Sequence, residues 1–283
     1  MTFKKIAIIG AGQMGQGIAY SSAISGYQVT LYDIHHDKLT QAIGQIQALG
    51  QKNLDKQKIS ETQHSLLHNQ LTTATTMEQL ADCDFIIEAA TEQEALKIEI
   101  FQKLHPLINS EAIFATNTSS LSVTKLALSS GRAAQFMGVH FMNPVPVMPL
   151  VELIKGLATS DETFSLCTDY VKTLGKDYAI SQDFPAFIVN RVLIPMINEA
   201  IFVLYEGISD KESIDKAMTL GTNMPMGPLA LADLIGLDTC LAIMNRLYTG
   251  FNDSKYRPCP LLVQYVEAGY YGRKTKKGFY DYA

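Results

Sequence analysis

The sequence has few cysteines, and their placement fits neither a metal site nor a disulfide framework. Cys83, Cys167, Cys240 and Cys259 are the four cysteines in 283 residues. They form no CxxC pair, and no histidine lies near them at zinc-finger spacing. We therefore expect all four thiols to be reduced and the chain to hold no metal.

The chain also lacks a long uninterrupted apolar run. The longest, residues 192–205, is broken by Pro195, Asn198 and Glu199, and it is shorter than the roughly 20 residues that span a bilayer. This pattern predicts a buried core helix and no membrane partner. Residues 1–10 lead directly into a strand-like segment, with no room for a signal peptide ahead of it, so we expect a cytoplasmic protein.

Clusters of basic residues are missing as well. The formal net charge is -5, and no Lys/Arg-rich run resembles a nucleic-acid footprint, so nucleic acid is not an expected partner. The composition, 47% hydrophobic and 18% charged, is that of an ordinary folded protein. At this length two domains are favoured over one core.

Short apolar runs alternate with longer amphipathic stretches through the first half of the chain. Strands are predicted near residues 6–9, 29–32, 85–87, 112–115, 136–141, 151–154 and 178–180. This alternation is typical of a parallel sheet built from βαβ units. Residues 38–72 are polar and helix-like, and we interpret them as a helical excursion near the site. After about residue 184 only helices are expected, which predicts an α/β domain, residues 1–184, followed by an all-helical domain, residues 185–283.

A glycine-rich segment follows the first predicted strand and opens a helix. Gly10, Gly12 and Gly15 enclose Gln13 and Met14, and Asp33 ends the next strand. This is the Rossmann-type dinucleotide-binding pattern. The glycines allow a tight turn, close approach of a pyrophosphate and close helix packing, while the acidic residue binds the ribose hydroxyls. A glycine turn without a ligand is the alternative.

The acidic residue also bears on the choice of cofactor. The Asp33 carboxylate would repel a 2′-phosphate, so it favours NAD over NADP. His35 and His36 are close enough in sequence to leave NADP possible.

His140 stands at the end of an apolar strand, and Glu152 lies within the next one. Parallel strands present their carboxyl ends to the ligand, and histidine can take an alcohol proton near neutral pH. A carboxylate inside an apolar strand needs a partner, and His140 is the natural one, as in a catalytic triad. The alternatives are a structural histidine and an exposed edge-strand glutamate.

Polar residues also follow the strand predicted at 112–115. Asn117 and Ser119 belong to the segment Asn117-Thr118-Ser119-Ser120, whose amide and hydroxyls could polarise a substrate carbonyl. Helix capping by Ser120 or Ser122 is the competing interpretation, and it leaves Ser119 to face the ligand.

Taken together, these motifs resemble the 3-hydroxyacyl-CoA dehydrogenase family, and the likeness covers the chain from its first strand to the C-terminus. Besides the segments above, it rests on Glu88-Ala89-Ala90, His140-Phe141-Met142-Asn143-Pro144, Asn190-Arg191, Pro225-Met226-Gly227-Pro228 and Gly278-Phe279-Tyr280. The resemblance implies interconversion of short-chain (S)-3-hydroxyacyl-CoA and 3-oxoacyl-CoA, such as 3-hydroxybutyryl-CoA and acetoacetyl-CoA. It also implies a helical domain that contributes to the substrate site and forms a homodimer.

Roles follow from the same resemblance. His140 is implied as the catalytic base, Glu152 as its orienting partner, and Ser119 and Asn190 as contacts to the substrate's 3-oxygen. Further counterparts of cofactor-binding residues are Glu92, Lys97, Asn117 and Lys274, and Lys56 matches a lysine that holds coenzyme A, with a solvated helix-face lysine as the alternative.

The chain departs from the family pattern at Met142, Pro149 and Ala186. Alanine at position 186 resists a positive φ if the backbone there needs one, and Pro149 replaces a common lysine. Two other functions stay open: a dehydrogenase of a non-CoA hydroxy acid or sugar acid on the same fold, and a non-catalytic structural relative.

Overall fold

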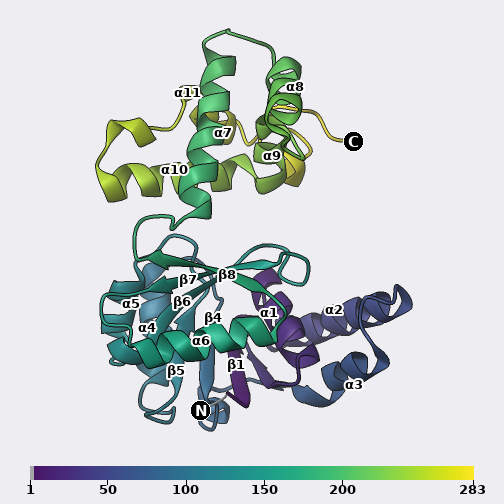
Figure 1. Ribbon diagram of the computed structural model, residues 1–283, viewed down its shortest axis with the longest axis vertical. Coiled ribbons are helices and arrows are strands. Elements are labelled where there is room, and N and C mark those ends of the chain that lie inside the picture. The colour runs from purple at the N-terminus through teal and green to yellow at the C-terminus, as the bar shows by residue number, and fades with distance from the viewer. Residues whose placement is uncertain (1–2) are drawn as a thin grey trace. The chain divides into compact units, whose positions relative to one another are not determined.

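The computed structural model describes residues 3–283, and the chain divides after Phe184 into two compact units. The first unit is an α/β domain and the second consists of helices and short turns (Figure 1). Each unit has its own hydrophobic core. The α/β fold followed by a helical domain therefore agrees with the predicted fold class.

An eight-stranded sheet forms the centre of the first unit, in the order β3-β2-β1-β4-β5-β6-β7-β8. Strands β1 to β6 run parallel, β7 is antiparallel to β6, and β8 is parallel to β7. The strands are β1 Lys5–Ile9, β2 Gln28–Tyr32, β3 Leu71–Ala74, β4 Phe85–Glu88, β5 Ile113–Thr116, β6 Phe136–Phe141, β7 Leu150–Lys155 and β8 Asp177–Gln182. The carboxyl ends of the first six strands consequently lie at one edge of the sheet.

The prediction of a helical excursion over residues 38–72 was wrong at its end. Helices α2, His36–Asp55, and α3, Glu61–Gln70, fill most of it, but Leu71–Ala74 forms the edge strand β3. This four-residue strand has two exposed threonines, Thr72 and Thr73, so it carries no apolar run. Its pairing with β2, a tertiary contact, makes it a strand.

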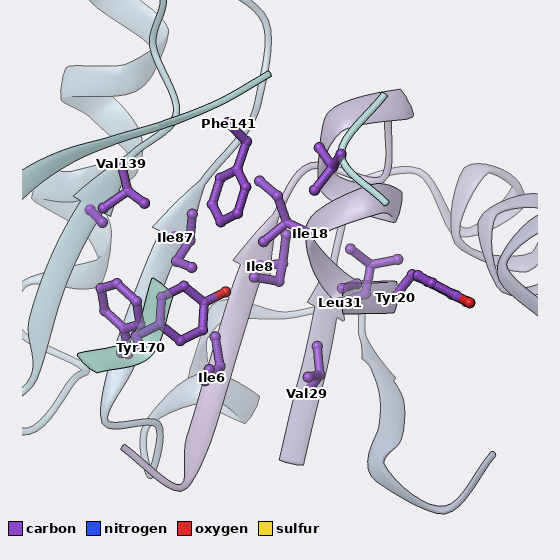
Figure 2. Close-up of a cluster of buried hydrophobic side chains, with 14 of the residues drawn as sticks. Ile6, Ile8, Ile18, Tyr20, Val29, Leu31, Ile87, Val139, Phe141 and Tyr170 are labelled. Carbon is purple, nitrogen blue, oxygen red and sulfur yellow. The ribbon is translucent and has the colours of Figure 1, made fainter. Parts of the chain in front are cut away.

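Helices cover both faces of the sheet. On one face, side chains of α1, Gln13–Ile24, and α6, Asp161–Thr173, pack against alternate strand residues such as Ile8, Val139 and Phe141 (Figure 2). On the other, Phe101 of α4, Glu94–Leu104, packs against the rings of Phe114 and Phe136. Helix α5, Val123–Ser129, also packs against β6 and β7, and 3-10 turns occur at η1, Met77–Leu80, and η2, Ala133–Gln135.

Because side chains alternate along a strand, this packing assigns the polar strand residues to one face. Ile87, Ala115, Val139 and Phe141 belong to the core on the α1 and α6 side. Their neighbours Glu88, Thr116 and His140 therefore point to the α4 and α5 side, and so does Glu152, which pairs with His140 across β6 and β7. Four polar side chains thus share one face near one edge of the sheet.

The second unit contains five helices in the part of the chain described. They are α7 Val189–Tyr205, α8 Lys211–Thr222, α9 Pro228–Ile235, α10 Leu237–Phe251 and α11 Pro260–Glu267, with 3-10 turns η3 Ser254–Tyr256 and η4 Arg273–Thr275. Within residues 3–283 no single helix is long and apolar enough to cross a membrane, and only α9 and α10 together pass that test, as a pair bent by 97°.

A buried carboxylate anchors the C-terminal segment to this helical unit. Asp233 of α9 is fully buried, and it accepts hydrogen bonds from the backbone N–H groups of Phe279 and Tyr280 and from the Tyr282 hydroxyl. A Cβ added at Gly278 would lie 1.9 Å from an Asp233 oxygen. The turn η4, which carries Lys274, is therefore held close to α9.

The backbone after Phe184 is left-handed at two successive residues. Ala186 has φ 63° and Phe187 has φ 53°. The left-handed conformation costs a residue with a Cβ roughly 1–2 kcal/mol, and Ala186 is fully buried in the core of the second unit. Alanine does therefore occupy a position that favours glycine.

Candidate active site

Three glycines shape the turn between β1 and α1, each for a different steric reason. Gly10 has φ 103°, and a Cβ there would lie 2.8 Å from the Ala89 carbonyl oxygen. A Cβ at Gly15 would lie 1.8 Å from the Gly10 oxygen, whereas one at Gly12 would meet nothing within 4 Å. Gly10 and Gly15 are thus required by the turn and the helix packing, and Gly12 leaves room for a ligand to approach the backbone.

Asp33 fixes this turn from the end of β2. Its Oδ2 accepts a hydrogen bond from Ala11 N at 2.9 Å, and its Oδ1 accepts one from His35 N at 3.0 Å. Helix α1 begins after Gly12, which provides no side-chain cap, and its first turn holds no acidic residue. The first N–H groups of α1 therefore suit an anionic ligand.

A cavity of about 920 Å³ lies over the glycine turn and includes Gly10, Gly12 and Asp33 among its lining residues. Lys38 and Lys103 line it as well.

Of the other two residues of the glycine motif, Gln13 is exposed and Met14 packs against the core. Open space at Gly12, helix N–H groups and a carboxylate after β2 are together what a dinucleotide requires, so these residues fit NAD.

His140 and Glu152 face each other across the antiparallel pair of β6 and β7. His140 Nδ1 and Glu152 Oε2 are 2.8 Å apart, and the two residues are 7% and 0% exposed. The alternative of an exposed edge glutamate is wrong, because β7 lies between β6 and β8. A carboxylate at this distance orients the imidazole and stabilises its protonated form.

The polar segment after β5 meets the end of β6 and a glutamate from the loop after β4. Asn117 Oδ1 accepts a hydrogen bond from Phe141 N at 2.9 Å. Glu92 Oε1 accepts from Ser119 N at 2.9 Å and from Ser119 Oγ at 3.3 Å. Ser122 caps α5 by accepting from Lys125 N, so it takes the capping role that was open between it and Ser120.

Lys97 of α4 contacts two glutamates of this group. Its Nζ lies 3.3 Å from Glu92 Oε2 and 2.6 Å from Glu88 Oε1. Burial raises the pKa of Glu92, but the Lys97 ammonium and hydrogen bonds from Thr118 and Ser119 outweigh it, so the net pKa is lowered. Glu92 is therefore a carboxylate at neutral pH.

Three further predicted site residues belong to the second unit or to the end of α2. Asn190 is in the first turn of α7 and Lys274 is in η4, both in the second unit. Lys274 Nζ is 2.8 Å from Asp238 Oδ1. Lys56 is exposed at the C-terminal end of α2, and it is Lys58 that lines a second cavity, of about 670 Å³, together with residues 143–147 after β6.

Sequence reasoning missed the structural parts played by Glu88 and Asp183. In the sequence, Glu88 was identified only within a family motif, although a glutamate directly after an apolar run also needs a partner if it is buried. Asp183 accepts hydrogen bonds from Ser122 Oγ and from Val123 N and Thr124 N at the start of α5. No local pattern indicates that contact, because Asp183 lies about 60 residues further along the chain.

A mainly parallel sheet with this glycine turn, an acidic residue after β2 and a histidine–carboxylate pair at the same sheet edge defines an NAD-dependent dehydrogenase. The model of the 3-hydroxyacyl-CoA dehydrogenase NAD-binding domain matches residues 5–183, and that of the family's C-terminal domain matches residues 187–282. The chain belongs to the 3-hydroxyacyl-CoA dehydrogenase family.

Relatives with similar sequences cover the chain almost completely. A 3-hydroxybutyryl-CoA dehydrogenase of Bradyrhizobium diazoefficiens is 53% identical, over 99% of this chain and 95% of its own. One of Clostridioides difficile is 47% identical, over 98% and 99%. The crystal structure of (S)-3-hydroxybutyryl-CoA dehydrogenase from Ralstonia eutropha, 45% identical, covers 100% of both chains with a TM-score of 0.97.

Alanine substitutions at Gly12 and Gly15 should separate ligand binding from folding. Gly12→Ala is expected to change the free energy of unfolding by less than about 1 kcal/mol, because its Cβ enters open space, but to weaken NADH binding at least about tenfold. Gly15→Ala should cost about 3 kcal/mol of stability through its clash. Urea unfolding and NADH fluorescence titration measure both; full NADH affinity in Gly12→Ala would contradict the assignment.

Proposed function

We propose that the protein interconverts short-chain (S)-3-hydroxyacyl-CoA, in particular 3-hydroxybutyryl-CoA, and the corresponding 3-oxoacyl-CoA, acetoacetyl-CoA, with NAD. The observation that carries this proposal is the buried His140–Glu152 pair, 2.8 Å apart, at the sheet edge that also carries the glycine turn. The printed names of the relatives support the choice of substrate.

His140 acts as the acid/base in this proposal. In the oxidative direction its Nε2 takes the proton of the 3-hydroxyl group, and Glu152 stabilises the resulting imidazolium through Nδ1. Glu152 is fully buried, so its charge acts at low dielectric and is little screened. In the reductive direction the imidazolium returns the proton to the 3-oxygen.

Bound NAD would supply the hydride chemistry at C3 of the substrate, taking up the hydride in oxidation and delivering it in reduction. Gly10, Gly12 and Gly15 with Asp33 would hold its adenosine and pyrophosphate half, next to Gln13 and Met14 of the same motif. Glu92, Lys97, Asn117 and Lys274 would serve the nicotinamide half. The Asp33 carboxylate, already oriented by two backbone N–H groups, disfavours the 2′-phosphate of NADP.

The substrate is assigned to the residues after β5 and β6. Ser119 and Asn190 would fix the 3-oxygen, and the 670 Å³ cavity lined by Asn143 and Lys58 would take the coenzyme A moiety. Lys58 is the one cation among the lining residues of that cavity, and Lys56 lies two positions away. Flexible ammonium groups suit a phosphate-bearing ligand.

A homodimer in the cytoplasm is part of the same proposal. The helical unit exposes the apolar side chains Val192, Ile208 and Leu220, 68%, 68% and 76% exposed, and a dimer that covered them would remove apolar surface from water. The four cysteines are free, as in compartments that keep thiols reduced. Light scattering tests the oligomer, and a monomeric mass at micromolar concentration would contradict it.

The function itself is tested by following NADH consumption with acetoacetyl-CoA, in parallel with NADPH and with free acetoacetate. We expect rapid oxidation of NADH with the CoA ester and at least about tenfold lower kcat/KM with NADPH, since the 2′-phosphate would face Asp33. Turnover of free acetoacetate would instead support a non-CoA dehydrogenase. Protein that binds NADH and reduces neither compound would support the non-catalytic relative.

Substituting the histidine pair should lower turnover without removing the cofactor. His140→Ala is expected to lower kcat by about 100- to 10,000-fold, and Glu152→Gln by a similar or smaller factor, because the acid/base and its orientation are lost. The dissociation constant of NADH should stay within about threefold. His68→Ala, at an exposed histidine of α3, is the control; equal losses of turnover and NADH affinity would refute the assigned role.

A further inference from the structure

Next to the proposed site, Glu88 forms a buried ion pair with Lys97, and the mechanism above gives Glu88 no role. Glu88, the last residue of β4, and Lys97, in α4, are 0% and 1% exposed, and Lys97 Nζ is 2.6 Å from Glu88 Oε1. Removing two charges from water is costly, and only close pairing with additional hydrogen bonds offsets that cost. A buried ion pair is weak evidence for a stabilising role. Its role is therefore inferred from its other contacts.

The Lys97 ammonium has three donors, and three acceptors surround it. They are Glu88 Oε1 at 2.6 Å, Ala90 O at 3.2 Å and Glu92 Oε2 at 3.3 Å. With each donor directed at a different acceptor, the ammonium has one orientation. Lys97 therefore ties the fully buried Glu88 to Glu92, which lies in the loop after β4.

Glu88 is itself held on both oxygens. Its Oε1 accepts a hydrogen bond from Ala90 N at 2.7 Å, and its Oε2 accepts one from Thr116 Oγ1 at 2.7 Å. Thr116 is the last residue of β5 and is fully buried. The ends of β4 and β5 and the first turns of α4 are thus joined through one carboxylate.

At the far end of this chain of contacts, Glu92 holds the segment that contains Ser119. Its Oε1 accepts from Thr118 Oγ1 at 2.5 Å, Ser119 N at 2.9 Å and Ser120 Oγ at 3.2 Å, as well as from Ser119 Oγ. An ionised acceptor is needed to gather this many donors. Burial raises the pKa of Glu88, and the Lys97 ammonium offsets only part of this shift. The pKa of Glu92, in contrast, is lowered overall. Lys97 therefore favours the charged form of Glu92 more than that of Glu88.

We propose that Glu88 is a positioning residue for Ser119: acting through Lys97, it fixes Glu92, and Glu92 fixes the backbone and hydroxyl of Ser119. This inference rests on the proposed function, which assigns Ser119 to the 3-oxygen of the substrate. Without the Glu88 charge, Lys97 would move toward Glu92 as its remaining carboxylate. The orientation of Glu92, and with it the place of the Ser119 hydroxyl, would then change.

The kinetic test is a double-mutant cycle with Glu88→Gln and Ser119→Ala, assayed with acetoacetyl-CoA and NADH. We expect Glu88→Gln to lower kcat about 10- to 100-fold, as a misplaced contact does. In the Ser119→Ala background the same substitution should lower kcat less than about threefold, because the residue through which it acts is gone. The control is Glu94→Gln, which breaks the surface pair of α4 with Lys125 and should leave kcat unchanged.

Equal effects of Glu88→Gln in both backgrounds, or a loss of thermal stability with no change in kcat, would overturn the proposal and leave a purely structural ion pair. If Glu88→Gln does not fold, Thr116→Val takes its place, since it removes the hydroxyl that holds Glu88 Oε2. Thr116→Ser keeps that hydroxyl and should retain most of the activity that Thr116→Val loses.

Amide hydrogen exchange tests the positioning role of Glu88 without any substrate. The Ser119 N–H donates to Glu92, so its exchange should accelerate at least about tenfold in Glu88→Gln and stay unchanged in Glu94→Gln. If the wild-type protein failed to reduce acetoacetyl-CoA, the proposed function would fall while this measurement still tested the positioning role. Unchanged exchange at residues 118–120 in Glu88→Gln would overturn that role.

Discussion

The antiparallel register between β6 and β7 is the constraint on which the first unit's chemistry depends. Six strands run in one direction, and the reversal at β7 returns the chain alongside β6 so that Glu152 lies directly across from His140. A parallel seventh strand would have needed a crossover connection. The reversal brings a carboxylate to the carboxyl edge of the parallel strands with only eight residues between β6 and β7.

The same edge gathers the other charged groups because parallel strands end together there. The glycine turn, Asp33 and the segment after Thr116 follow β1, β2 and β5, and Glu88 is the last residue of β4. Each buried carboxylate has its own partner: an imidazole for Glu152, and for Glu88 an ammonium shared with Glu92. Since a buried charge without a partner would be very costly, these pairings restrict the orientations of their side chains.

The two faces of the sheet differ in polarity near the strand ends. Alternate residues of β1, β4, β6 and β7 form the continuous apolar core under α1 and α6 (Figure 2). The opposite face is apolar at Phe114 and Phe136, where Phe101 packs, and becomes polar toward the strand ends. An apolar region behind the charged groups lowers the local dielectric and strengthens their interactions.

Much of the fold and of the candidate site could be predicted from the sequence because the signals are local. The apolar strands, the glycine turn with Asp33 and the change to helices after residue 184 each depend on neighbouring residues. The pairing of His140 with Glu152 was accessible because a glutamate within an apolar strand requires a partner. The edge strand Leu71–Ala74 could not be predicted in this way, because it forms by pairing with β2.

The sequence by itself determined the α/β and helical character of the two parts, the dinucleotide motif and the pairing of His140 with Glu152, because chain periodicity and residue chemistry encode them. Only the tertiary structure decided that Lys97 lies between Glu88 and Glu92, that Asp183 caps α5 and that Lys58, not Lys56, lines the second cavity. These are contacts between distant segments, and they depend on how the strands and helices pack, which no local pattern records.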